Sequence, residues 1–216
     1  MKHTPQKILM LLALTACLGG SLTACVPVLM GSAVMGGMVA TDRRTSGTQL
    51  EDEGIDLRAA SRIQDNLGER GHVTVTSYNR RVLLTGEVPS VQDKQLVEQV
   101  VLRVDNVREV VNELAVLGTA SLTQRTSDTL ITGRVKAALV DAKDLFSNAF
   151  KVVTERGTVY LMGRVTQRES DRATDIVRQT SGVQKVVRVF EFISEDELRN
   201  LLPQPAPAPV PAASKP

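Results

Sequence analysis

Two blocks of hydrophobic residues occur twice in this chain, in the same order. The block VLLTGEV at 82–88 reappears as VYLMGRV at 159–165, and the block VREVVNELAV at 107–116 reappears as VQKVVRVFEF at 183–192. The first pair is separated by 77 positions and the second by 76. Because both blocks keep their order with one residue of slippage, the pattern indicates an internal duplication. Residues 51–117 are called the first copy below, and residues 121–194 the second copy.

The hydrophobic periodicity predicts the same elements in each copy. In the first copy the expected elements are a helix over 56–67, strands over 73–76 and 82–88 joined by a turn, a helix that starts after Ser90, and a strand over 107–116. In the second copy they are a helix over 128–140, strands over 150–154 and 158–165, a helix over 169–180, and a strand over 183–193. Each copy therefore has the order αββαβ. The predicted fold class is α+β, with a small three-stranded mixed sheet and two helices on one of its faces in each copy.

Two glycines interrupt strand patterns at equivalent places. Gly86 and Gly163 lie inside the second strand of their copies. A glycine in a strand often marks a bulge or a place where another backbone comes close. We expect one of these structural roles at both positions rather than a ligand site.

The N-terminal segment has the pattern of a bacterial secretory signal. A short basic stretch at 1–7 precedes an apolar run at 8–18, and Leu-Thr-Ala-Cys ends at Cys25. This predicts a lipoprotein signal peptide over 1–24 and acylation of Cys25. The same four residues end at Cys17, which stays an alternative acylation site, with a shorter apolar run. A membrane-spanning helix is the other alternative, but glycines and Pro27 interrupt any uniform apolar segment of sufficient length.

An acylated Cys25 would anchor the protein in a membrane through its lipid chains. Val26, rather than Asp, follows it, which favours release to the outer membrane. Residues 25–50 are then expected to be the acylated cysteine and a tether. The polar segment 41–47 carries two arginines that are expected to lie near lipid headgroups.

The charge is divided unequally between the copies. From Cys25 onward the chain has 24 Lys and Arg against 24 Asp and Glu. Residues 51–117 hold 8 basic and 12 acidic residues, whereas residues 121–193 hold 12 basic and 8 acidic residues. The second copy is therefore the one expected to meet an anionic partner. An aromatic content of 3% without Trp does not favour base-stacking platforms, so nucleic acid is not an expected partner.

Few residues in this sequence are of the types that usually perform catalysis. His72 is the only histidine after the leader, and we expect it in a solvated turn at a strand entry. No spacing of His, Cys and Asp resembles a zinc site, and no glycine-rich phosphate loop follows a strand. Arg80 and Arg81 are expected at a solvated hairpin tip. The sequence predicts a protein that is not an enzyme, with no catalytic residues, no metal site and no cofactor.

The first helix of the second copy has more apolar surface than one core contact needs. An inward stripe is complete with Ile131, Val135, Ala138 and Leu139. The remaining faces hold apolar and small residues beside two cations: Leu130, Gly133, Arg134, Lys136, Ala137 and Val140. Such a stripe flanked by basic residues suits the interface of an anionic bilayer. The alternative is that the helix packs its second face on the first copy or on the 121–127 segment.

These features resemble the BON domain, and the whole arrangement from Cys25 to about Ile193 resembles outer-membrane lipoproteins with two BON domains. The residues that carry the resemblance are Asp42-Arg-Arg-Thr45, Ser127-Asp-Thr129, Tyr160-Leu-Met-Gly-Arg-Val165 and Gly182-Val-Gln-Lys-Val-Val187. The resemblance implies αββαβ units, a periplasm-facing location at the outer membrane, and binding of anionic phospholipid such as phosphatidylglycerol through the first helix of the second copy. The family usually has Trp at the position of Leu130.

The sequence leads to two functional hypotheses. The main one is a lipid-anchored, non-enzymatic protein that binds anionic phospholipid and supports outer-membrane integrity. The second is an adaptor for envelope-assembly or cell-wall proteins, because small sheets with exposed edge strands accept partner strands. Beyond the second copy, residues 195–216 are expected to form a short helix and then a disordered tail, since 203–216 contains six of the nine prolines.

Overall fold

The computed structural model describes residues 42–118 and 121–201. All of them belong to one compact unit that spans Met38–Pro216. The signal peptide expected over 1–24, Cys17, Cys25, the tether up to residue 41 and the proline-rich tail lie outside the described residues. The elements, in chain order, are α3 (Ser46–Leu67), β1 (His72–Tyr78), β2 (Arg81–Val88), α4 (Val91–Leu102), β3 (Glu109–Asn112), β4 (Ala115–Val116), α5 (Leu122–Asp141), the short 3-10 helix η1 (Ser147–Ala149), β5 (Lys151–Glu155), β6 (Thr158–Val165), α6 (Gln167–Arg178), β7 (Lys185–Phe192) and α7 (Glu195–Leu201).

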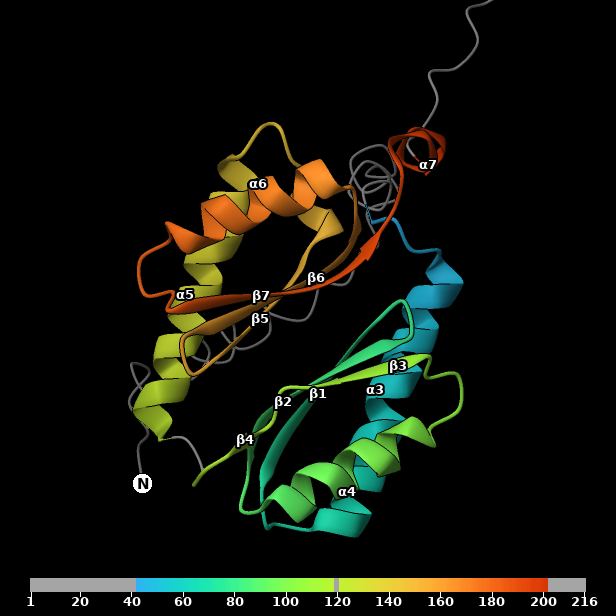
Figure 1. The fold of residues 1–216 in the computed structure, drawn as a ribbon, viewed down its shortest axis with the longest axis vertical. Coiled ribbons are helices and arrows are strands. Elements are labelled where there is room, and N and C mark those ends of the chain that lie inside the picture. Colours follow the sequence, from blue (N-terminus) through green and yellow to red (C-terminus); the bar gives the residue numbers. More distant parts are fainter. Residues whose placement is uncertain (1–41, 119–120, 202–216) are drawn as a thin grey trace, which may run out of the picture. The chain divides into compact units, whose positions relative to one another are not determined.

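The predicted αββαβ order is confirmed in both copies (Figure 1). In the first copy β1 pairs antiparallel with β2, and β2 pairs in parallel with β3 and β4. In the second copy β5 pairs antiparallel with β6, and β6 pairs in parallel with β7. Both sheets are therefore mixed, as predicted, and α7 is the short helix expected after the second copy.

One face of each sheet is covered by the two helices of its own copy. The core of the second copy joins Ile131, Val135 and Leu139 of α5 to Val159 and Leu161 of β6. The core of the first copy joins the equivalent positions of α3 to strand β2, with the buried residues Ile55, Ala59, Ile63, Val82 and Leu84. The predicted placement of two helices on one face is thus confirmed. Of the inward stripe predicted for α5, Ile131, Val135 and Leu139 are buried and Ala138 is partly buried.

The other faces of the two sheets bury a third set of hydrophobic residues. Alternate strand residues point to this side, because successive side chains in a strand face opposite ways. The set comprises Tyr78, Leu83, Tyr160, Met162 and Val189. It draws on both sheets, so the two copies pack against each other through the sheet faces that their own helices leave uncovered. All three cores use described residues only, so a fragment that starts at Met38 retains every contact named here.

Three expected boundaries differ in the structure. Helix α5 begins at Leu122 rather than 128, because Ser121 caps it. Helix α3 begins at Ser46 rather than 56, because Thr45 caps it: its hydroxyl accepts a hydrogen bond from the Thr48 N–H. The single strand expected over 107–116 is divided into β3 and β4. Leu114, between them, is 2% exposed and turns into the core, while the Asn112 side chain accepts a hydrogen bond from the Leu114 N–H. Burial of one leucine therefore interrupts the ladder.

Both strand glycines allow a close backbone approach, as predicted. A Cβ atom added to Gly86 would lie 2.1 Å from the His72 carbonyl oxygen. One added to Gly163 would lie 2.3 Å from the Ala149 carbonyl oxygen. Neither space admits a side chain unless backbone atoms move.

We expect Gly163→Ala to destabilise the fold by about 1–3 kcal/mol, because the new methyl group overlaps a backbone oxygen. Gly133→Ala is the matched control: a Cβ there meets nothing within 4 Å, and alanine should stabilise the helix by about 0.5–1 kcal/mol. Urea unfolding of residues 38–216 measures both free energies. Equal free energies of unfolding for Gly163→Ala and the wild type would contradict this account of the glycine.

Candidate functional site

Helix α5 is held in place by its buried residues Ile131, Val135 and Leu139 and by the hydrogen bonds of Asp128. The Ser121 hydroxyl caps its N-terminus by accepting a hydrogen bond from the Gln124 N–H. Asp128, 5% exposed, accepts hydrogen bonds from the N–H groups of Arg156 and Gly157 at 2.8 Å each. The helix is thus tied to the tip of its own β5–β6 hairpin, and its rotation about its axis is set.

The same device holds α3 in the first copy. Asp52 accepts hydrogen bonds from the N–H groups of Asn79 and Arg80, at 2.8 and 2.7 Å. Both residues have positive φ, which places their amides on the same side of the turn. Arg80 is exposed, as predicted, but Arg81 is not a solvated tip residue: its guanidinium pairs with Glu109 and donates to the Phe190 carbonyl oxygen of the second copy.

All six residues predicted to contact lipid lie on the solvated side of α5. Leu130 is 57% exposed and Val140 66% exposed, although both are large hydrophobic residues. The other four are also exposed: Gly133, Arg134, Lys136 and Ala137. The alternative in which this face packs on the first copy or on the 121–127 segment is therefore wrong: the face is exposed, and residues 122–127 are the first turns of α5 itself. The exposed position of the residues is established, and their contact with lipid remains a prediction.

The cations of this face have no carboxylate partner among the described residues. Arg134 donates to the Ser181 carbonyl oxygen at 3.4 Å. Neither Arg134 nor Lys136 lies within 4.0 Å of a carboxylate oxygen in the described part of the chain. Their charge is available to an external anion.

Lys136 and Val140 also border a pocket of about 530 Å³. Arg44 and Lys151 line it too, but both are balanced by acidic residues. Arg44 pairs with Asp42 and Asp52 at 2.8 and 2.9 Å, and Lys151 lies 3.9 Å from Asp56. The pocket is therefore less positive than its lining suggests.

The segment expected to be a tether near headgroups contains a buried ion pair that sequence reasoning missed. Arg43 is 6% exposed and donates to both carboxylate oxygens of Glu169, at 2.6 and 2.8 Å. It also donates to the Arg164 carbonyl oxygen at 2.7 Å. Arg44 stacks over the Tyr78 ring, 4.2 Å from its centroid. The prediction that these two arginines face lipid headgroups is wrong, because both are engaged within the fold.

Glu169 is placed for this pairing by its position at the start of α6. It forms a capping box with Thr166, in which the Glu169 carboxylate accepts the Thr166 N–H. Burial alone would raise the pKa of Glu169, but the hydrogen bonds from Arg43 and Thr166 more than offset it and hold the pKa below the usual value. Arg43 thus joins the segment before α3 to the second copy.

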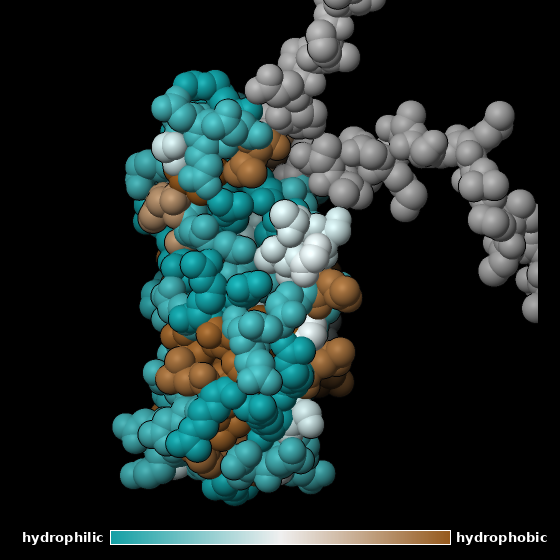
Figure 2. Space-filling model, turned by 90° about the vertical axis from the view of Figure 1, so that its right-hand side faces the viewer, coloured by the Kyte–Doolittle hydropathy of each residue, from teal (hydrophilic) through white to brown (hydrophobic). Residues whose placement is uncertain are grey.

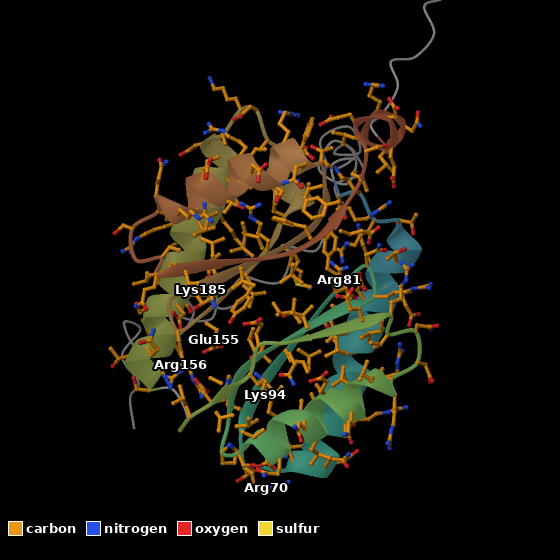
Figure 3. The ribbon with its side chains drawn as sticks, in the orientation of Figure 1. Arg70, Arg81, Lys94, Glu155, Arg156 and Lys185 are labelled. Carbon is orange, nitrogen blue, oxygen red and sulfur yellow. The ribbon has the colours of Figure 1, made fainter. Side chains whose placement is uncertain are left out.

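His72 was expected in a solvated turn, but it begins β1 and is partly buried. Its Nδ1 lies 3.8 Å from Glu87, whose side chain is 1% exposed and accepts a hydrogen bond from Arg156 at 3.1 Å. Glu155 and Arg156 occupy the tip of the β5–β6 hairpin (Figure 3). In the described residues, no cluster of three or more His, Cys, Asp or Glu side chains is arranged to hold a metal ion.

Both copies match the model of the BON domain, at residues 55–118 and 127–193. The chain belongs to the BON-domain family. The BON domains found by this match coincide with the two αββαβ units of the fold.

Three relatives extend the comparison. The chain is 35% identical over 190 residues to a Haemophilus influenzae protein named outer membrane lipoprotein DolP. The aligned region covers 87% of this chain and 96% of that protein. It is 29% identical to a 21 kDa hemolysin of Actinobacillus pleuropneumoniae, over 70% of this chain and 79% of the relative. It is 34% identical to an uncharacterized Anaplasma centrale protein, over 53% of this chain and 78% of the relative.

No described helix is long and apolar enough to span a membrane.

We expect Arg43→Ala to destabilise the fold by about 3–5 kcal/mol, because it leaves the buried Glu169 carboxylate without its cation. The control is Arg172→Ala, which removes an ion pair with Asp144 in which both side chains are about half exposed, and should cost less than about 1 kcal/mol. Urea unfolding of residues 38–216 measures both variants. If both variants lose less than about 1 kcal/mol of unfolding free energy, the Arg43–Glu169 ion pair is not important to stability.

Proposed function

We propose that this chain is a lipid-anchored, non-enzymatic outer-membrane protein that binds anionic phospholipid through α5 and supports outer-membrane integrity. The relationship to a protein named outer membrane lipoprotein supports the location. In this proposal Cys25 is the acylated residue, on the basis of the Leu-Thr-Ala-Cys pattern, and the BON domains face the periplasm. The observation that supports α5 as the binding site is its exposed face. Large apolar side chains lie there beside cations that have no carboxylate partner among the described residues.

The spacing on α5 suits contact with a bilayer surface. Leu130, Gly133, Ala137 and Val140 follow one another at intervals of three and four residues, so they lie along one side of the helix. Small residues at the centre of this stripe let the helix backbone approach the surface closely. Arg134 and Lys136 flank the stripe, where they can reach phosphate groups while the apolar residues enter the headgroup region.

The first copy shows that exposed apolar residues alone do not distinguish α5. Helix α3 also exposes Leu50 and Leu57, at 71% and 73%. These leucines lie among Glu51 and Glu53, and Arg58 is neutralised by Glu51 at 2.6 Å. Figure 2 shows the side of the molecule on the right of Figure 1, where α3 lies: hydrophobic patches are separated by hydrophilic surface. Charge therefore favours α5 as the helix that binds an anionic surface.

The edge strand β7 gives less support to a role as a protein adaptor. Its residues Val189 and Phe190 are 5% and 6% exposed, so they are buried inside the fold. The Phe190 carbonyl oxygen already accepts a hydrogen bond from Arg81 at 2.6 Å. Part of this edge is thus occupied by the first copy.

We expect Arg134→Glu with Lys136→Glu to weaken binding to phosphatidylglycerol vesicles at least tenfold, since each basic residue near an anionic surface contributes about 1 kcal/mol. The inward stripe is untouched, so the fold should be retained. Flotation of residues 38–216 with phosphatidylcholine vesicles, with and without phosphatidylglycerol, measures the affinity. Wild-type affinity in a folded double variant would show that α5 is not the lipid site.

We expect Leu130→Trp to strengthen vesicle binding, because an indole at this exposed position adds an interfacial anchor. Its fluorescence should shift to shorter wavelength when phosphatidylglycerol vesicles are added, since the wild-type chain contains no Trp. The matched control is Leu57→Trp on α3, which should show neither effect. A tryptophan at 130 that stays in water in the presence of vesicles contradicts the proposal.

A further inference from the structure

The loop between α6 and β7 forms a second basic feature of the second copy. A shallow pocket of about 350 Å³ is lined by Arg178, Val183, Gln184, Lys185 and Val186. None of these five lining residues is acidic. Lys185 lies at the first position of β7 (Figure 3), and both cations are exposed. The pocket thus presents two positive charges, an amide and two valines.

The loop that supplies this pocket's lining contacts α5 through Arg134. The guanidinium of Arg134 donates to the Ser181 carbonyl oxygen of the loop. A Cβ added to Gly182 would lie 2.9 Å from the Ile131 side chain and 3.6 Å from Arg134 Nη1. The loop is therefore packed directly on α5, and Arg134 lies beside it.

The first copy has the same geometry, but acidic residues on its loop offset the cations Arg103 and Arg108. Arg58 lies 76 positions before Arg134 and approaches the equivalent loop in the same way, with the Asp105 carbonyl oxygen 3.5 Å away. Where the second copy has Ser181 and Lys185, the first has Asp105 and Glu109. In addition, Leu102 stands at the position of Arg178, and Glu51 at that of Ser127. The backbone of the duplicated unit does not require these cations, since the first copy folds without them.

The acidic residue that pairs with Arg178 is a weak competitor for a phosphate group. Asp175 lies 3.6 Å from Arg178, and the two side chains are 62% and 59% exposed. An ion pair this exposed is screened by water and salt and contributes little. Arg178 can therefore exchange this contact for a phosphate group.

We propose that the α6–β7 loop is a second contact site for the phosphate groups of an anionic bilayer, with Arg178 and Lys185 as its ligands. This inference rests on the proposed function of α5. A lipid surface fits better than a free phosphate ion, because the pocket is shallow and open, two valines lie beside its cations, and its loop is packed on α5. A bilayer presents many phosphates at once, so two modest sites on one face reinforce each other.

The test is vesicle flotation of residues 38–216 carrying Arg178→Glu and Lys185→Glu. We expect at least a tenfold loss of affinity for phosphatidylglycerol vesicles. The matched control is Arg103→Glu with Arg108→Glu, two exposed cations on the equivalent loop of the first copy, which produces the same change in net charge. This control should stay within about twofold of the wild type, because that loop does not reach the bilayer. Arg178→Lys with Lys185→Arg should also bind like the wild type.

The outcomes separate this inference from the function of α5. If the loop variant binds like the wild type while Arg134→Glu with Lys136→Glu loses affinity, the second site is wrong and the α5 proposal stands. If neither variant loses affinity, both are wrong. If the first-copy control weakens binding as much as the loop variant, net charge explains the effect and the site is wrong. Displacement from vesicles by millimolar inorganic phosphate, but not by sodium chloride of equal ionic strength, would overturn the choice of a lipid surface.

Discussion

The structure depends on the burial of both faces of two small sheets. Units of about 60 residues bury only a modest core, so each copy gains stability when its second sheet face is also covered. Strand β6 shows how this is done: Val159 and Leu161 face the helices, whereas Tyr160 and Met162 face the first copy. Because the two sheets cover each other, neither copy needs the outer surfaces of its helices for packing. The outer surfaces of the helices therefore remain available to contact an external partner.

Polar contacts fix how the two copies are joined. Arg43 reaches from the segment before α3 to the cap of α6, and Arg81 reaches from β2 to β7. Arg156 of the second copy reaches Glu87 of the first. A buried ion pair such as Arg43–Glu169 contributes more to a specific arrangement than to net stability, since desolvation offsets much of its attraction. Within the second copy, the contact of the α6–β7 loop with α5 places Arg134 beside that loop.

The repeat, the order of the elements and the inward stripe of α5 could be predicted from the sequence because each leaves a local hydrophobic pattern. The start of α3 could not, because its first turns contain Gly47, Gly54 and several polar residues, and only the cap at Thr45 marks it. The break between β3 and β4 follows from burial of Leu114, whose neighbours lie elsewhere in the chain. The role of Arg43 depends on a partner 126 positions away. One signal in the sequence indicated that Glu169 needs a distant partner. In the first copy Arg70, in the loop before β1, pairs with Asp93, which is equivalent to Glu169. The corresponding loop of the second copy, at 142–150, contains no arginine.

The central claim is that only the second copy of this duplicated unit meets the anionic membrane. Methyl NMR of residues 38–216 with phosphatidylglycerol nanodiscs that carry spin labels on the lipid headgroups tests it most directly. The leucines provide an internal comparison, since Leu130 on α5 and Leu50 and Leu57 on α3 are all well exposed. The account predicts strong broadening of the methyl signals of Leu130 and Val140, with those of Leu50 and Leu57 unchanged. Equal broadening on the two helices, or broadening of the α3 leucines alone, would contradict it.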